Sequence, residues 1–172
     1  MPHPIIPRPT ETTPGFSTYI ALVPETNLLD FLTQQLTDLT KLLRNLPEKE
    51  ALLHHAPYTW SIKQVVGHII DTERIFAYRA LRIARNDSTP LPSLDQDAYV
   101  KFANFDRIPL AELLEEFERT RQSNLLLFQH IESEAWPRRG TASNNPVTAA
   151  TFAYAIAGHT KHHLDIIRKR LA

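Results

Sequence analysis

Hydrophobic residues recur at three- and four-residue spacing in four long segments of the chain, and this is the period of an amphipathic helix. The segments run from about residue 25 to 46, 62 to 85, 109 to 131 and 147 to 171. The first stripe consists of Leu28, Leu32, Leu36, Leu39, Leu42, Leu43 and Leu46. The second consists of Ile62, Val65, Val66, Ile69, Phe76, Ala80 and Ile83, and the third of Leu110, Leu113, Leu114, Phe117, Leu127 and Ile131. Four such helices bury their apolar faces together, so the pattern predicts an all-α fold, a four-helix bundle.

Residues at the start of three segments match the preferences of helix N-termini. Ser61 is followed three positions later by Gln64, which is a capping-box pattern. Pro109 suits a first helical turn, and Asn145 followed by Pro146 predicts a cap and a first helical residue. These signals place the second, third and fourth helices within a few residues.

The connections predict how the chain is organised. Prolines crowd residues 1–24, so we expect an extended amino-terminal arm there and a bundle domain over 25–172. The connections 86–108 and 132–146 are long, and long loops in compact domains are often functional. We expect a short helix in the first of them, covering one end of the bundle, and at least one long crossover.

Charge and composition narrow the function classes. Lys+Arg and Asp+Glu number 19 each, which gives no basic surplus for nucleic acid or an anionic membrane. The chain has no cysteine, so a transition-metal site must use His, Asp or Glu. The longest apolar stretch, residues 149–158, is about half of what a bilayer requires, and the first residues lack a signal-peptide pattern. We therefore expect a cytoplasmic protein.

Three histidines fall within five positions of the fourth predicted helix, in AGHTKHHLDIIRKRL. Because a helix turns about 100° per residue, His159 and His163 lie on one face, about 40° apart. That face is otherwise apolar, whereas His162 points with polar residues. We expect His159 and His163 to face the bundle interior and His162 to face away.

His68 on the second predicted helix shares a line with Asp71 and Arg79. If His68 meets the two inward histidines, three imidazoles could bind one metal ion and leave a coordination position open. The spacing alone leaves a second interpretation, in which the histidines are hydrogen-bonded packing residues. An intra-bundle ion pair of Arg79 with Asp71, or with an acid on another helix, also stays open.

Three motifs, WSIKQVVGHIIDTER, LPSLDQDAYV and AGHTKHHLDIIRKRL, resemble the DinB superfamily of bacterial four-helix-bundle proteins. The resemblance implies a DinB-like bundle in which His68, His159 and His163 hold a divalent metal ion, nickel or zinc. It also implies a branch of metal-dependent hydrolases and of thiol transferases that use bacillithiol, besides mycothiol-dependent isomerases. Several members of the family are dimers, so a homodimer is expected.

Further roles follow from position. Asp71 is the first candidate for a general base or for a partner of a metal-binding histidine. Arg79, by resemblance, would bind a carboxylate of a thiol cofactor or a small-molecule substrate. Tyr99 and Phe102, with Trp60, would line the mouth of a pocket or pack across the bundle end. We thus expect a metal-dependent hydrolase or low-molecular-weight-thiol S-transferase; a non-catalytic bundle that binds a metal or small molecule is the alternative.

Overall fold

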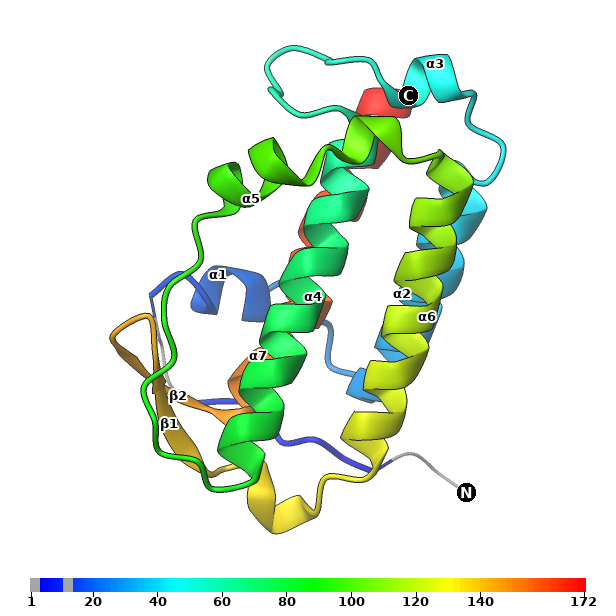
Figure 1. Cartoon of the computed structure of the whole chain (residues 1–172). Coiled ribbons are helices and arrows are strands. Elements are labelled where there is room, and N and C mark those ends of the chain that lie inside the picture. Colours follow the sequence, from blue (N-terminus) through cyan, green and yellow to red (C-terminus); the bar gives the residue numbers. More distant parts are fainter. Residues whose placement is uncertain (1–3, 11–13) are drawn as a thin grey trace.

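Four long helices dominate the computed structural model, which describes residues 4–10 and 14–172 (Figure 1). They are α2 (Leu28–Leu43), α4 (Ile62–Ala84), α6 (Leu110–Gln129) and α7 (Ala149–Leu171). Each lies in a segment predicted to be helical, with ends that differ by a few residues at most. Helix α4 packs against α6 and α7, and α2 packs against the same two helices, which closes the bundle. The predicted all-α bundle is confirmed.

The predicted capping box at the start of α4 is confirmed, but the cap predicted for α7 is wrong. Ser61 accepts a hydrogen bond from the Gln64 backbone, and the Gln64 side chain bonds back to the Ser61 backbone. Helix α7 is instead capped by Thr148, which forms a capping box with Thr151. Residues Asn145–Thr148 form the strand β2, so their backbone is extended where the sequence pattern indicated a helix.

A short hairpin, which the sequence analysis did not predict, occupies much of the connection between α6 and α7. Strands β1 (Arg139–Ala142) and β2 pair antiparallel, with Ala142 opposite Asn145. The two turn residues, Ser143 and Asn144, have φ of 50° and 62°. Two consecutive positive φ angles fit the tight turn of a two-residue hairpin, but neither residue is the glycine that usually signals it.

The connection between α4 and α6 contains the expected short helix. Helix α5 (Gln96–Ala103) is capped by Asp95 and packs against α4, and a 3-10 turn, η1 (Phe105–Arg107), follows. Two further short helices are α1 (Ser17–Ile20) and α3 (Glu48–Ala51), and a second 3-10 turn is η2 (Ser133–Ala135). No described helix is long and apolar enough to cross a membrane.

The amino-terminal segment differs from the expected extended arm. Four of its apolar side chains are buried in the core: Ile6, Phe16, Ile20 and Val23. Arg8 holds the segment together, because its guanidinium donates to the backbone oxygens of Ile20 and Val23. Residues 1–3 and 11–13 of the expected arm lie outside the described residues. A domain boundary at residues 24 and 25 stays a prediction.

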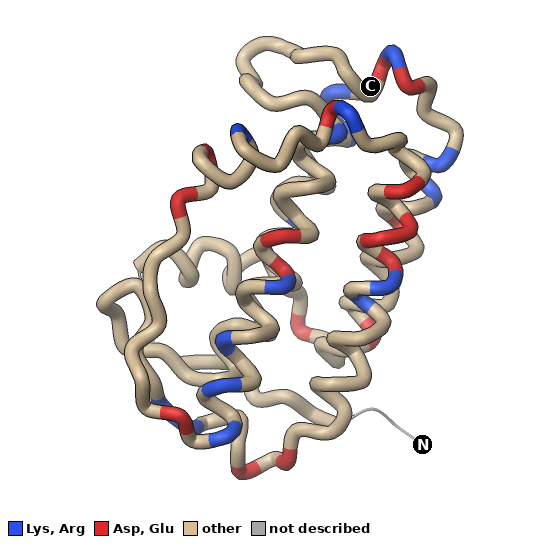
Figure 2. The backbone as a smooth tube through the Cα atoms, in the orientation of Figure 1, with Lys and Arg blue, Asp and Glu red and all other residues tan. Residues whose placement is uncertain are grey.

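The apolar core is divided into two clusters along the bundle axis. Between them, each of the four long helices contributes buried polar side chains, which we call the polar layer: Gln35, His68, Thr72, Glu73, Arg121, His159, Thr160 and His163. The stripe predicted on α4 lies in these clusters. In the other stripes Leu36, Leu42, Leu46 and Leu127 are only partly buried, and Phe128 of α6, which was not in the predicted stripe, is fully buried. Along the backbone, Lys and Arg are interspersed with Asp and Glu (Figure 2).

The centre of the polar layer is Arg121, whose side chain is fully buried. Its Nε and Nη2 donate to the two carboxylate oxygens of Glu73 at 2.7 and 2.8 Å. Nη1 donates to the Leu32 carbonyl and the Gln35 side chain on α2, and Nη2 also donates to Thr160 on α7. One guanidinium therefore connects all four long helices directly beside the histidines.

Candidate metal centre

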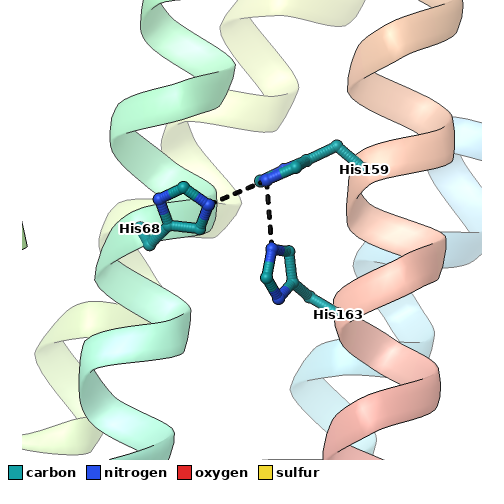
Figure 3. A group of neighbouring side chains, drawn as sticks. All are labelled: His68, His159 and His163. Atoms are coloured by element: carbon teal, nitrogen blue, oxygen red, sulfur yellow. Dashed lines mark hydrogen bonds between the residues drawn. The ribbon is translucent and has the colours of Figure 1, made fainter. Parts of the chain in front are cut away.

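Three histidines of the polar layer come together between α4 and α7. His68 lies on α4, and His159 and His163 lie one turn apart on α7, with exposed fractions of 4%, 3% and 8%. Figure 3 shows the three rings turned toward one another across the space between the two helices. His162 is exposed. The expected orientations of the three clustered histidines are therefore confirmed, and so is the meeting with His68.

The ring nitrogens converge on one point. The Nε2 atom of His159 lies 2.9 Å from Nε2 of His68 and 3.1 Å from Nε2 of His163. All three ligand atoms lie within 4.8 Å of one another. Two nitrogens bound tetrahedrally to one zinc ion at 2.0–2.1 Å would be about 3.3 Å apart. The spacing in the structure is thus already close to that of a coordination sphere.

The protonation of the group also suits metal binding. Burial lowers the pKa of His68 to about 4, with a smaller contribution from the nearby His162. Burial lowers the pKa of His159 and of His163 well below the usual value, and charge repulsion among the histidines adds to it. At neutral pH the imidazoles are neutral and offer lone pairs. A single shared proton can satisfy only one of the two close contacts of His159 Nε2, whereas a cation would satisfy both.

Aromatic side chains enclose the three histidines. Trp60 packs on His68, with ring centroids 4.9 Å apart, and Phe76 lies 6.3 Å from His159. Tyr19 of α1 contacts both His159 and His162 edge-on, at 5.3 and 5.8 Å. Tyr19 could not be predicted as a neighbour of the histidines, because no sequence pattern around it indicates a contact with α7.

The approach of Tyr19 depends on Gly158. A Cβ atom at this position would lie 1.9 Å from the Tyr19 carbonyl oxygen, so only glycine lets α1 cross α7 here. Since Gly158 immediately precedes His159, the amino-terminal segment is held against the three histidines at this crossing.

A cavity of about 400 Å³ opens onto His68 and His159. Its walls come from α1, α4, the start of α5 and the β1–β2 turn; besides the two histidines they include Phe16, Tyr19, Thr72, Phe76, Arg79, Gln96 and Asn145. Thr72, one turn beyond His68, lies with its hydroxyl 3.5 Å from His68 Nδ1. We call this space the first cavity.

Arg79 contributes a buried positive charge to the first cavity. Its exposed fraction is 4%, and Nη2 donates to the Pro92 carbonyl at 2.6 Å. The guanidinium lies over the rings of Phe76 and Phe152. It forms no ion pair with any acidic side chain among the described residues. The ion pair with Asp71, one alternative at the sequence level, is therefore absent.

Asp71 and Tyr99 each lie near an arginine: Asp71 near Arg74, and Tyr99 near Arg79 of the first cavity's wall. Asp71 lies 3.9 Å from Arg74, its side chain is 28% exposed, and its pKa is raised by partial burial. Tyr99 is 49% exposed on α5. Neither residue lines a described cavity at the histidines. A catalytic role for Asp71 and a substrate contact for Tyr99 stay predictions that this arrangement does not support.

A second cavity, of about 280 Å³, reaches the same group from another side. It opens onto His163 rather than onto His68 and His159, and Trp60 forms part of its wall. Gln96 lines both cavities. The three histidines are thus accessible from two separate spaces.

Comparisons with known proteins agree with this architecture. A family model described as the DinB superfamily matches residues 32–167. The solved structure of YfiT from Bacillus subtilis, a probable metal-dependent hydrolase with an unusual four-helix bundle topology, superposes with a TM-score of 0.76. The two chains are 14% identical over 86% of this chain and 87% of YfiT, so this likeness shows the fold alone. No curated protein matches the chain. Because the family model spans most of the chain, including all three histidines, the chain belongs to the DinB superfamily.

Proposed function

We propose that the protein is a metal-dependent enzyme in which His68, His159 and His163 hold one divalent ion, nickel or zinc. The observation that carries the proposal is the convergence of the Nε2 atoms of three buried, neutral histidines, two of which line the first cavity. Three protein nitrogens leave a position for a substrate, which distinguishes a catalytic site from a closed structural one. Imidazole suits nickel and zinc equally, so the donor set does not choose between them.

The bound ion would supply positive charge that lowers the pKa of water or of a thiol at the open position. The chain's own residues do the rest. Arg79 would hold an anionic group of the substrate in the first cavity, since its guanidinium is buried without an acidic partner. Trp60, Phe76 and Tyr19 would keep bulk water from the histidines. The YfiT likeness favours hydrolysis of a small-molecule substrate.

Transfer of a low-molecular-weight thiol, such as bacillithiol, is a second candidate reaction, and one observation favours it. Hydrolysis needs one organic substrate and water, whereas thiol transfer needs two organic substrates at the same centre. The histidines are reached from two cavities, which would suit two substrates. The chain has no cysteine, so the thiol would come from outside. A cytoplasmic homodimer remains the expected setting.

Elemental analysis of untagged protein tests the metal site. We expect about one nickel or zinc ion per chain, and little metal in the His159→Ala/His163→Ala double variant. The matched control is His162→Ala, which removes an exposed histidine from the same helix and should keep the ion. Absence of metal after reconstitution would overturn the proposal. A loaded protein that turns over neither esters nor thiol–electrophile pairs would indicate the non-catalytic binding bundle instead.

A further inference from the structure

The second cavity is lined by His163 at one end and by a second polar residue, Arg170, at the other. Its wall runs along α7 from His163 to Arg170, with Tyr58, Trp60 and Ile166 forming apolar surfaces between. His163 and Arg170 are seven positions apart, which is two helical turns, or about 10.5 Å along the axis. The cavity therefore joins the metal centre at one end to a guanidinium at the other.

Two of the residues that line this cavity each have a buried nitrogen with no hydrogen-bond partner among the described residues: Nδ1 of His163 and Nη1 of Arg170. The other nitrogens of Arg170 are used, since Nη2 donates to the Leu53 carbonyl at 2.9 Å and Nε donates to His55 Nδ1 at 3.2 Å. A buried charged donor left without an acceptor is costly. An acceptor that enters the cavity would remove this cost.

The charges around Arg170 favour an anion. Its exposed fraction is 9%, and it forms no ion pair with an acidic side chain in the part of the chain that the structure describes. The ring of Tyr58 lies 5.5 Å from the guanidinium in a cation–π contact, which attracts the guanidinium but brings no negative charge to it. Asp97 is the acidic residue of the cavity wall, and it is exposed on α5.

We propose that the second cavity binds a small organic acid, whose carboxylate takes the free donor of Arg170 and whose apolar body lies against Tyr58 and Trp60. The anionic group would lie about two helical turns from the metal centre. Resting on the proposed function, this assigns the second substrate a chemical class: a carboxylate-bearing molecule with its reactive end toward His163. Arg79 would bind an anionic group in the first cavity, and Arg170 would bind the carboxylate in the second.

Binding to metal-free protein tests this proposal independently of the metal. The probe is 3-phenylpropanoate, compared with its neutral counterpart 3-phenylpropanamide, and the readout is the fluorescence of Trp60 in the cavity wall. The other tryptophan, Trp136, is 1% exposed in the core and gives a constant background. We expect the acid to bind about tenfold or more tightly than the amide, as a hydrogen bond to a charged group allows.

Three variants test whether Arg170 causes the preference for the acid over the amide. Arg170→Met should bring the acid and the amide to similar affinity, whereas Lys169→Met, which removes an exposed charge one position earlier, should keep the preference. Asp97→Asn should tighten binding of the acid severalfold, because it removes the negative charge at the rim. Equal binding of acid and amide by the wild type, absence of binding, or equal loss in the Lys169→Met variant would overturn the proposal. Metal loading that fails while the acid still binds would count against the metal site alone.

Discussion

Replacing Arg121 with methionine should be among the most destabilising single changes in this protein. The side chain makes five hydrogen bonds, two of them to Glu73, and both members of the pair are buried, with side-chain exposures of 0% and 1%. Without Arg121, the Glu73 carboxylate would keep, among the described residues, the bond from Asn124 at 3.3 Å. Breaking a buried pair in this way costs about 3–5 kcal/mol, because a charge is left uncompensated.

The free energy of unfolding in urea measures this cost, and two further variants test the reason for it. Arg119→Met removes an exposed arginine that pairs with Glu115 on the same helix, and should change stability by less than about 0.5 kcal/mol. The double variant Glu73→Met/Arg121→Met removes both charges of the pair and should be at least about 1 kcal/mol more stable than Arg121→Met. A single variant that loses under about 1 kcal/mol, or a double variant that loses the sum of both single effects, would refute the reasoning.

Two other predictions follow from the histidine cluster and its neighbour. Gly158→Ala should displace α1, because the new methyl group would overlap the Tyr19 carbonyl. Hydrogen exchange should show that the amides of residues 17–23 lose protection while those of α4 keep it. Unchanged protection of α1 would contradict this prediction. In metal-free protein the free energy of unfolding should fall as the pH drops from about 6.5 toward 4, by up to about 1.4 kcal/mol per pH unit for each histidine. The sign follows from burial, which lowers the pKa of His68 to about 4 and those of His159 and His163 well below 6.5, so that the unfolded chain takes up protons first. Urea titrations between about pH 7 and 4 should show that the free energy of unfolding depends less steeply on pH in the His159→Ala/His163→Ala variant than in the wild type. A wild-type free energy of unfolding that does not change over this range would exclude the effect.

Helical periodicity was sufficient to predict the bundle, because each apolar stripe repeats over several turns. It also oriented His159 and His163, since a helix fixes the direction of side chains one turn apart. The hairpin was missed because its turn is formed by Ser143 and Asn144 without a glycine. The spacing on a single helix does not show which residues line a cavity: Asp71 is one turn from His68 but does not line either cavity, so its catalytic role stays a prediction.

The polar layer could have been noticed in the sequence. Buried polar residues stand near the middle of each long helix: Gln35 on α2, Glu73 on α4, Arg121 on α6 and Thr160 on α7, besides the histidines. Such residues at a common height in all four helices indicate one buried polar plane. Tyr19 and Arg170 are different, because their link to the site depends on a crossing at Gly158 and on the folding of residues 53–60 against the end of α7.

Because α1 crosses α7 at Gly158, some residues that border the three histidines lie outside the part of the chain that the family model covers. The three histidines lie inside residues 32–167, the part of the chain that its family model covers, whereas Tyr19 and Arg170 lie outside it on opposite sides. One of these residues borders each cavity. A change at Tyr19 or at Arg170 can therefore alter what reaches the three histidines while the histidines and the core of the bundle stay the same.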